Sequence, residues 1–382
     1  MSYYETVLDR LASHAESEEF RGHDPYDILS SPLPFRWLGT YTAAVATQLH
    51  KRNPLNLRRL LGIKKSYNPK ALGLLLYAYS RLQRHYAERD YSPQLKRLTE
   101  LIREKTATGY HGACWGYPFA WASPGKFVPA NAPNGVVTSF VVKGLHEYYL
   151  LSGDSTVREL LLSAVDFVTH DLPAYEDAAG RCISYTPFRR DICYNASLLS
   201  AEVLARAYSI TGDPELKEIA LSCARFVLAR QQEDGRWNYS ADLATGKERE
   251  QVDFHQGFVI DSLETIQRYT GTVLQNGQKA IERGVSFYGK QQFYPDGRSR
   301  WRYPEDYPVD IHHQAQGIIT LSRYDNVLAR TILDWTLKHL YDVQKGFFYY
   351  RKYPWFTDRT NYLRWGDAWM MVALTEVVTG GE

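Results

Sequence analysis

The chain has 382 residues, 44% of them hydrophobic, and its 45 basic and 43 acidic residues leave a net charge of only +2. This hydrophobic content is typical of a globular protein with a core of its own. Because the opposite charges are well mixed, the sequence excludes the concentrated basic surface that a nucleic-acid-binding protein needs. The basic residues from Lys51 to Lys65 form one cluster, interpreted as a solvated loop and helix face, with a membrane-surface or partner contact as the alternative.

The N-terminus carries Glu5 and Asp9 and lacks the apolar core of a signal peptide. No window approaches eighteen consecutive apolar residues, so no membrane-spanning helix is predicted. The cytoplasm is therefore the expected location. The cysteines show neither CxxC spacing nor the density of a secreted disulfide scaffold; they are Cys114, Cys182, Cys193 and Cys223.

The predicted elements begin with an isolated helix over residues 3–16, a divergent segment to residue 65, and a helix pair over 71–86 and 93–104. From residue 134 onward one pattern repeats: a polar start, an apolar helical run, a short turn and a second helix. The repeated units span 134–169, 194–230, 255–290 and 312–340, and a single helix over 365–378 follows them. Ser/Thr-Gly-Asp turns join the helices of a unit, because Gly ends one helix and Asp caps the next.

Counting the incomplete ends, the repeat gives about six helical hairpins, with the terminal helices as candidates to close one of them. Six such hairpins curl into a toroid with an inner and an outer ring of helices, and strand patterns are confined to the loops. The sequence therefore predicts one all-α domain over residues 1–382, an (α/α)6 toroid. An open helical solenoid is the alternative, which the small number of repeats disfavours.

In a toroid the starts of the inner helices converge at one mouth of the central cavity. Aligning the units on these starts superimposes Asp191, Asp253 and Asp310. The polar residues at these helix starts are expected to form a ring around the mouth; they are Asn134, Tyr194, Asn195, His255, Gln256, His312, His313, Gln314, Arg364 and Asp367.

The three aligned aspartates are expected to cap helices and to orient the neighbouring histidines. His255 and His312 recur at the same position of two units, which favours the cavity over a structural role. The Asp-x-His pairs could also bind a metal, but they lack the spacing of a zinc-binding helix motif. Neither a metal nor a cofactor is expected.

A second group of candidates lies in the loop before residue 310. Glu305, Asp306 and Tyr307 precede a proline there, and the alternative is a solvated turn. The neighbouring Arg302 could clamp a substrate carboxylate with its guanidinium. The aromatic fraction of 14% suits a glycan cleft, although packing between helices is the alternative for most rings. Further candidates for substrate contacts are Trp237, Trp301, Tyr350 and Arg351.

Three strings carry a family resemblance. The segment Glu305-Asp306-Tyr307-Pro308 resembles the acidic-Tyr-Pro segment in the C-terminal helical domain of D-glucuronyl C5-epimerases. Two later strings, at 348–351 (Phe-Tyr-Tyr-Arg) and 361–365 (Asn-Tyr-Leu-Arg-Trp), are similar to later segments of that family in the same order. The overlap covers about residues 297–378. The chain also resembles uncharacterised toroid proteins encoded with bacterial and archaeal surface-polysaccharide enzymes.

The resemblance implies inversion at C5 of a glucuronate within a glycan, with proton transfer on two sides of the sugar ring. Asp306 and Tyr307 would lie on one side, and Arg364 would hold the carboxylate. Two residues after the family's Arg-Trp a tyrosine is expected, but this chain has Asp367, and Ala368 replaces an accompanying histidine. The second proton-transfer group would then be supplied by one of Asp367, His255, His312 and Tyr194.

Several alternatives stay open on the same toroid. A glycoside hydrolase would use two carboxyl groups around a water, such as Asp306 with Asp367 or Glu305 with Asp253. A uronyl lyase would share the first proton abstraction. The Gln-Trp string from Gln231 to Trp237 is similar to that of terpenoid cyclases, though it can also lock hairpins together. A non-catalytic glycan-binding protein is the remaining class.

The interpretation that accounts for most of these patterns is an isomerase of the uronate C5-epimerase kind on a six-hairpin, glycosidase-like toroid. Its substrate would be a uronate-containing oligo- or polysaccharide, or a lipid-linked precursor, in surface-polysaccharide biosynthesis. No nucleic-acid partner and no integral membrane segment are expected, and a homodimer stays open.

Overall fold

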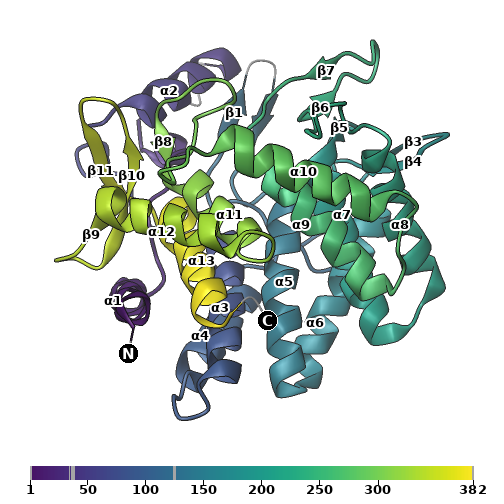
Figure 1. The fold of residues 1–382 in the computed structure, drawn as a ribbon, viewed down its shortest axis with the longest axis horizontal. Helices are drawn as coiled ribbons and strands as arrows, with labels where there is room; N and C mark the ends of the chain where they lie inside the picture. Colours follow the sequence, from purple (N-terminus) through teal and green to yellow (C-terminus); the bar gives the residue numbers. More distant parts are fainter. Residues whose placement is uncertain (1, 34, 36–38, 124–125, 381–382) are drawn as a thin grey trace.

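The computed structural model describes residues 2–33, 35, 39–123 and 126–380, which form two concentric rings of helices (Figure 1). Each inner helix packs against the next, and the last packs against the first. The inner helices are α3 (Pro69–His85), α5 (Gly135–Ser152), α7 (Tyr194–Thr211), α9 (His255–Thr270), α11 (Ile311–Leu321) and α13 (Ala368–Val378). This closed order confirms the predicted (α/α)6 toroid and excludes an open solenoid.

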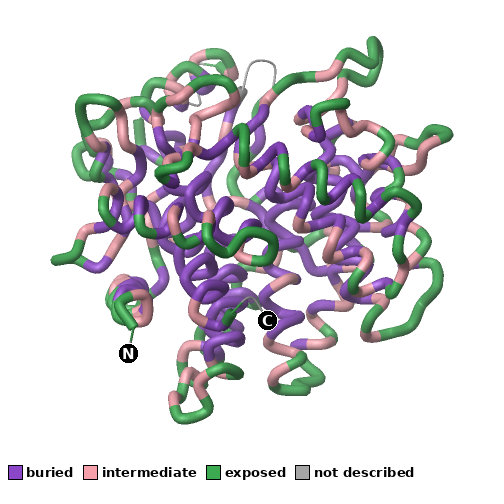
Figure 2. Tube along the Cα trace, in the orientation of Figure 1, coloured by how far each residue is buried: buried purple, intermediate pink, exposed green. Residues whose placement is uncertain are grey.

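Every inner helix is paired with an outer helix. The outer helices are α1 (Tyr3–Ser17), α4 (Ser92–Glu104), α6 (Ser155–Asp166), α8 (Pro214–Leu228), α10 (Gly277–Gln292) and α12 (Asn326–Leu340). The first helix, α1, packs on the last, α13, so the terminal helices close the sixth hairpin, as the sequence suggested. Tyr4 on α1 donates a hydrogen bond to Asp334 on α12 over 2.7 Å. Figure 2 shows the inner ring almost wholly buried and the outer ring exposed on one face.

Local sequence explains where the helices begin and end. Gly153 and Gly212 end α5 and α7 in the left-handed conformation, which glycine adopts without strain. The next residues, Asp154 and Asp213, accept hydrogen bonds from the first turns of α6 and α8. The predicted Gly-Asp turns are therefore confirmed.

The strands are short and lie in the connections that lead from an outer helix to the next inner helix. Most pair antiparallel in small sheets, β1 with β2, β3 with β4, β5–β6–β7 in order, and β11–β10–β8 with β9 beside β10. Their bounds are β1 (Trp121–Ser123), β2 (Lys126–Val128), β3 (Ala174–Asp177), β4 (Gly180–Ile183), β5 (Ile192–Cys193), β6 (Ser240–Ala241), β7 (Glu248–Arg249), β8 (Val309–Asp310), β9 (Tyr341–Asp342), β10 (Phe347–Lys352) and β11 (Thr357–Asn361). These connections gather at the end of the toroid where the inner helices begin, which we call the mouth (Figure 1).

The segment between α1 and α3 also lies at the mouth. It contains the short helix η1 (Asp27–Ser30) and α2 (Thr40–Arg52), which packs on β1. The prediction of a solvated basic face was wrong for Arg58, which is buried. Its Nε lies 2.9 Å from Asp27 Oδ1, and its Nη2 donates to the Asp24 carbonyl over 2.8 Å. The ion pair with Asp27, which sequence spacing does not reveal, draws this guanidinium inside.

Adjacent hairpins are locked by buried tryptophans. Trp237 donates from Nε1 to the Val227 carbonyl over 3.0 Å, and Gln231 bonds the Ala280 carbonyl of α10 over 2.8 Å. A Cβ on Gly284 would lie 2.6 Å from the Trp237 ring, so glycine is needed for this close approach. The Gln-Trp string thus has the structural role that the sequence analysis considered.

Two features differ from the sequence expectations. The helix predicted over 365–378 begins with the π-helical turn η4 (Leu363–Asp367), because the Asp367 N–H bonds the Tyr362 carbonyl and widens the turn. The second helix of the first repeated unit likewise ends in a π-helical turn, η3 (Phe167–Asp171).

In the part of the chain that the structure describes, no helix is long and apolar enough to cross a membrane.

The expected cap by Asp191 was wrong. Its carboxylate accepts a hydrogen bond from the Tyr185 N–H over 2.9 Å, and Cys193 precedes α7 without a side-chain cap. The short strand β5 separates Asp191 from the helix start, so its carboxylate reaches back to the preceding loop instead.

Candidate functional site

The starts of α9 and α11 bring three histidines together near the toroid axis, and the start of α13 adds Trp369 beside them. The Phe254 ring lies between the imidazoles of His255 and His312, and each ring pair is stacked with centroids 4.2 Å apart. The other face of His312 lies 4.5 Å from the Trp369 indole. We call His255, His312 and His313 the imidazole cluster.

Asp253 orients His255. One carboxylate oxygen accepts a hydrogen bond from the His255 backbone over 3.1 Å and lies 2.5 Å from Nδ1 of its ring. Burial alone would raise the pKa of Asp253, but His255 and its hydrogen bonds lower this pKa to about 2. A carboxylate that is ionised at neutral pH fixes the proton on Nδ1 and leaves Nε2 as the basic nitrogen. The expected orientation of His255 by Asp253 is confirmed, but the expected cap was wrong, because Phe254 occupies the N-cap position of α9 without a side-chain cap.

His312 and His313 are buried, and burial disfavours the charged form of both imidazoles. Burial, reinforced for His312 by Lys70 and Arg364, lowers the pKa of His312 well below its usual value, and burial lowers that of His313 to about 4. Both ring nitrogens of His312 and Nε2 of His313 have no hydrogen-bond partner among the described residues. Leaving a buried polar atom unpaired costs roughly 1–3 kcal/mol. Native proteins keep such groups mainly where a ligand or water can bind.

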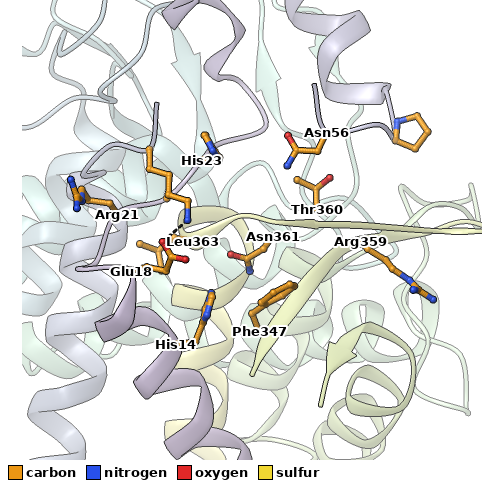
Figure 3. A pocket seen from close by; sticks show the side chains of 13 residues that line it. His14, Glu18, Arg21, His23, Asn56, Phe347, Arg359, Thr360, Asn361 and Leu363 are labelled. Carbon is orange, nitrogen blue, oxygen red and sulfur yellow. Dashed lines mark hydrogen bonds and ion pairs between the residues drawn. The ribbon is translucent and has the colours of Figure 1, made fainter. Parts of the chain in front are cut away.

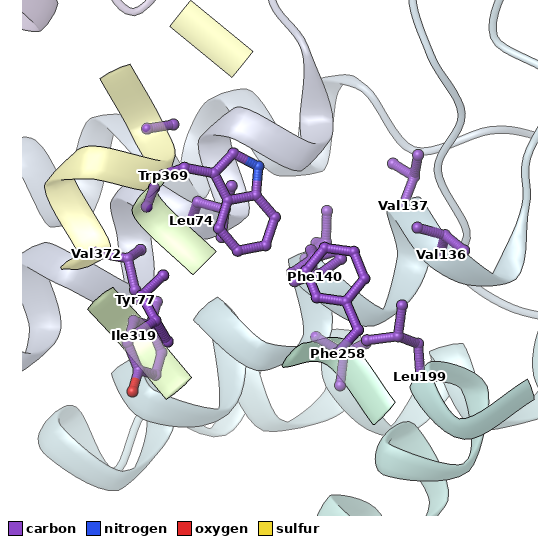
Figure 4. Packing of buried hydrophobic residues seen from close by; sticks show 14 of the residues in the cluster. Leu74, Tyr77, Val136, Val137, Phe140, Leu199, Phe258, Ile319, Trp369 and Val372 are labelled. Carbon is purple, nitrogen blue, oxygen red and sulfur yellow. The ribbon is translucent and has the colours of Figure 1, made fainter. Parts of the chain in front are cut away.

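Lys70, in the first turn of α3, faces the same region. Its ammonium lies 4.2 Å from the Phe140 centroid, 5.0 Å from Trp369 and 5.4 Å from Phe258. These three rings gather in the centre of the inner ring (Figure 4). Burial and, less strongly, Arg364 lower the pKa of Lys70 well below its usual value, against the opposing effect of Asp24. No ion pair or hydrogen bond to this amine is found over residues 2–33, 35, 39–123 and 126–380.

Arg364 lies nearby but is already paired. Its Nη2 donates to Asp24 Oδ1 over 2.7 Å, and its Nε makes a second bond to Asp24 Oδ2. The guanidinium also faces the rings of Trp365 and Tyr117 at 4.8 and 5.2 Å. A substrate carboxylate could bind Arg364 only by sharing it with Asp24.

Asp310 holds the wall behind the cluster. It caps α11 by accepting a hydrogen bond from the His312 N–H over 2.9 Å, as predicted. The expected orientation of the His312 ring by Asp310 was wrong, because neither ring nitrogen has a hydrogen-bond partner among the described residues. Arg351 and Trp365 both donate to Asp310 over 2.7 Å. Tyr350 lies 6.4 Å from Trp365 in the same wall. Arg351 is therefore held by a protein carboxylate, and Tyr350 is buried.

The acidic loop, which carries Glu305, Asp306 and Tyr307, lies at the rim of the mouth. Asp306 is half-exposed and pairs with Arg300, and the Tyr307 ring faces Arg298 at 4.8 Å. Glu305 is exposed. The loop reaches the cluster through Arg302, whose Nε is 3.8 Å from Asp253 Oδ2, and through the Arg300 carbonyl, 3.0 Å from His313 Nδ1.

Arg351 also covers one face of Trp301, with its guanidinium 4.3 Å from the ring centroid. The acidic loop and the wall behind the cluster thus meet at this indole.

Four predicted site residues take part in contacts between hairpins and not in the imidazole cluster. Gln256 accepts from and donates to the Trp237 backbone over 2.9 and 2.6 Å. The Tyr194 hydroxyl donates to Glu248, and Asn195 accepts from the Cys193 thiol over 3.3 Å. Trp237 is fully buried in its lock.

Asp367 faces α1 rather than the cluster. Its carboxylate accepts hydrogen bonds from the Phe348 N–H over 2.9 Å and the Asn361 amide over 2.6 Å. Burial raises the pKa of Asp367 to about 7. His14 Nε2 lies 3.9 Å from this carboxylate.

A pocket of about 480 Å³ lies on this side of the mouth (Figure 3). It is lined by residues of α1, of the segment that follows α1, of the loop after α2, and of β10 and β11. Gly22, His23 and Leu363 also line a second, narrower pocket, which extends to Asp24 and Arg364.

Sequence reasoning missed Lys70, Asp24 and Phe254. A signal existed for Lys70, because Asn68-Pro69-Lys70 starts an inner helix as Asp310-Ile311-His312 does. Nothing in the pattern around Asp24 indicated that its carboxylate reaches Arg364 across the chain. Among the described residues, no group of three or more His, Cys, Asp or Glu side chains could hold a metal ion.

The two closed helical rings around a buried polar centre define a six-hairpin toroid, and solved structures share this architecture. Cellobiose 2-epimerase from Bacillus thermoamylovorans is similar, with a TM-score of 0.65 and 13% identity over 82% of this chain and 90% of that one. Unsaturated glucuronyl hydrolase from Bacillus sp. GL1 is similar with a TM-score of 0.63 and 14% identity, covering 97% of this chain and 94% of that one.

The GH76 α-mannanase of Bacteroides thetaiotaomicron is also similar, with a TM-score of 0.62 and 15% identity over 83% of this chain and 87% of that one. The sequence matches no protein-family model and no curated protein. At these identities the likeness establishes the fold, and the chemistry is argued from the site.

Proposed function

We propose that this protein is a carbohydrate epimerase that inverts C5 of a uronate residue in a glycan by proton transfer through imidazoles. The observation that carries the proposal is the imidazole cluster, whose buried ring nitrogens on His312 and His313 have no partner among the described residues. By their names, the similar structures act on carbohydrates, and two of those names concern epimerisation and glucuronyl groups.

The chemistry needs a base that removes the C5 proton and an acid that returns one from the opposite face. Asp253 prepares His255 to act as the base at Nε2. His312 lies on the other side of the Phe254 ring and is the candidate for the second proton-transfer group. Because burial disfavours its charged form, it can return a proton only after it has been protonated, which the bound substrate carboxylate would favour. The Phe254 ring fills the space between the two imidazoles, so the proposal requires this ring to move aside when the sugar binds.

Removing a proton next to a carboxylate places negative charge on the carboxylate oxygens, and a nearby cation stabilises that charge. Lys70 is the better candidate for this contact, because Arg364 is already held by Asp24. Binding of an anion would favour the protonated form of Lys70 and so offset the effect of burial. Asp306 and Tyr307, which the family resemblance assigns to proton transfer, would approach the sugar from the open rim.

The same geometry disfavours hydrolysis. An inverting hydrolase needs one protonated and one ionised carboxyl group around a water. The carboxylates nearest the cluster are engaged instead, Asp24 by Arg364, Asp253 by His255 and Asp310 by Arg351. The resemblance to glucuronyl C5-epimerases supports a role in cytoplasmic synthesis of surface glycans.

Proton NMR of glucuronate-containing oligosaccharides incubated with the protein in heavy water tests the proposal. We expect deuterium at C5 with unchanged chain length. Shortened chains without C5 exchange would contradict the proposal in favour of a hydrolase, and an unsaturated product would indicate a lyase. Exchange at C2 of a reducing-end sugar would retain proton transfer but overturn the uronate assignment.

A further inference from the structure

The pocket beside α1 is separate from the imidazole cluster, because none of its lining residues belongs to that cluster. Its volume of about 480 Å³ lies within the range of small-molecule sites, roughly 300–1,000 Å³. Figure 3 shows side chains from α1, from the segment before α2 and from the β10–β11 hairpin surrounding it.

Positive charge dominates the lining. The lining contains three cationic side chains, Arg21, Lys65 and Arg359, and one carboxylate, Glu18. Lys65 is neutralised by Glu18, and Arg21 pairs with Glu19 over 2.7 Å. Arg359 has no ion-pair partner within the described residues. An anionic group in the pocket would therefore find at least one guanidinium available.

One side of the pocket is polar, and hydrogen bonds hold its side chains in place. The Asn361 amide donates to the buried Asp367 carboxylate over 2.6 Å and to the Phe348 carbonyl over 3.2 Å. These bonds fix the amide plane and direct its oxygen away from Asp367. The Phe347 ring, packed 5.1 Å from the His14 ring, supplies an apolar face beside the amide. Flat apolar rings next to fixed amides suit a sugar, which presents a C–H face and a rim of hydroxyls.

We propose that this pocket binds an acidic sugar residue of the same glycan whose neighbouring residue reacts at the imidazole cluster. Gly22, His23 and Leu363 line both this pocket and the narrower one that reaches Asp24 and Arg364, so the pocket lies beside the Asp24–Arg364 ion pair. The inference rests on the proposed function and extends it, since the glycan would carry a second acidic residue beside the one that reacts.

Calorimetric titration of the full-length protein tests this assignment with two matched ligands. One is a glucuronate-containing oligosaccharide, and the other is the same oligosaccharide with its carboxylates reduced to alcohols. The His255→Asn variant is used so that no turnover occurs during the titration. We expect the acidic ligand to bind at least tenfold more tightly than the reduced ligand, and added salt to decrease this difference in affinity.

The exposed Arg359 provides the decisive variant. Arg359→Gln should weaken binding of the acidic ligand about tenfold, as expected for losing one charge-assisted hydrogen bond, and should leave the reduced ligand unchanged. Arg330→Gln on α12, another exposed arginine outside the pocket, is the matched control and should bind like its parent.

Equal binding of the acidic and reduced ligands, or an Arg359→Gln variant that binds like its parent, would overturn the pocket assignment. Arg359-dependent binding of inorganic phosphate as tight as that of the oligosaccharide would overturn the uronate as ligand. If C5 exchange occurs but binding does not depend on Arg359, only the pocket assignment is contradicted. If binding depends on Arg359 but no exchange occurs, only the epimerase proposal is contradicted.

Discussion

Single residues at the toroid axis decide the chemistry that this fold can perform. Lys70 has no acidic partner among the described residues and lies in a box of three aromatic rings, so it contributes little to folding. Its sequence neighbours gave a usable signal, the polar start of an inner helix. The pairing of Arg364 with Asp24 gave none, because the two residues are 340 positions apart in the chain.

Replacing Lys70 with methionine should separate activity from stability. We expect Lys70→Met to keep or slightly raise the free energy of unfolding, since it removes a buried amine without an acidic partner from an apolar site. C5 exchange should fall by about two orders of magnitude or more, because one charge-stabilising group typically supplies that factor.

Lys143→Met on α5 is the matched control. Burial lowers the pKa of this partly buried lysine, and the carboxylates of Glu202, Asp261 and Glu376 oppose that effect, so they would lose a favourable cation. We expect it to destabilise the fold while exchange per folded molecule persists. Urea unfolding and NMR exchange rates measure both variants, and a strongly destabilised Lys70→Met would contradict a role outside folding.

Asp253 should affect stability and catalysis together. Its pKa is lowered to about 2 in the folded protein, so its contribution is present above its unfolded pKa, about 3.9, and is lost as the pH falls toward about 2. Asp253→Asn should therefore cost about 2 kcal/mol at pH 7, and the difference from the wild type should shrink below about pH 4.

The same variant should lower the exchange rate by about 10²–10⁴-fold, since His255 loses the partner that sets its tautomer. Denaturant unfolding across pH and exchange rates at pH 7 give the two readings. A variant with normal exchange would show that His255 does not need this orientation.

At the scale of elements, the helices were predictable because Gly-Asp turns and apolar periodicity mark them directly. The turn η4 was not, since its widened geometry depends on hydrogen bonds from Phe348 and Asn361 to Asp367 that come from β10 and β11. For the same reason, the sequence identified the acidic loop through the family resemblance but could not predict how far this loop lies from the imidazoles. Periodicity locates helices, whereas side-chain partners across hairpins require the fold.

Two glycines of α10 give opposite predictions. A Cβ on Gly284 would lie 2.6 Å from the rigid Trp237 ring, so Gly284→Ala should destabilise the protein by about 1–3 kcal/mol through overpacking. The nearest atom to a Cβ on Gly289 is 3.5 Å away, so Gly289→Ala should stabilise α10 by up to about 1 kcal/mol. Urea unfolding of both variants checks the hairpin lock, and equal effects would contradict it.

Asp367 predicts how the η4 region responds to pH. Burial raises its pKa to about 7, so its contribution is fully present below the unfolded pKa and is lost as the pH rises through about 7. The wild type should lose up to about 4 kcal/mol relative to Asp367→Asn between about pH 4 and pH 8. Thermal unfolding of both proteins across this range is the measurement, and parallel pH profiles would refute the raised pKa.

For the whole molecule, ring closure joins the two ends of the chain. Helix α1 packs on α13, and the segment after α1 lies at the mouth and supplies Asp24 to Arg364 (Figure 1). Helix α1 therefore completes the ring, as the sequence suggested, and the following segment, which the sequence showed only as divergent, completes the site. The imidazoles, Lys70 and the pocket beside α1 lie at the mouth because all long connections gather there.

The most direct test of the account compares hydrogen exchange at C5 for each epimer of the uronate separately, in heavy water, with wild-type protein and two variants. Wild type should exchange both epimers. His255→Asn should lose exchange of one epimer and His312→Asn exchange of the other, since each imidazole serves one face. Wild-type protein that exchanges neither epimer, or variants that exchange both at the wild-type rate, would contradict proton transfer by the imidazole cluster.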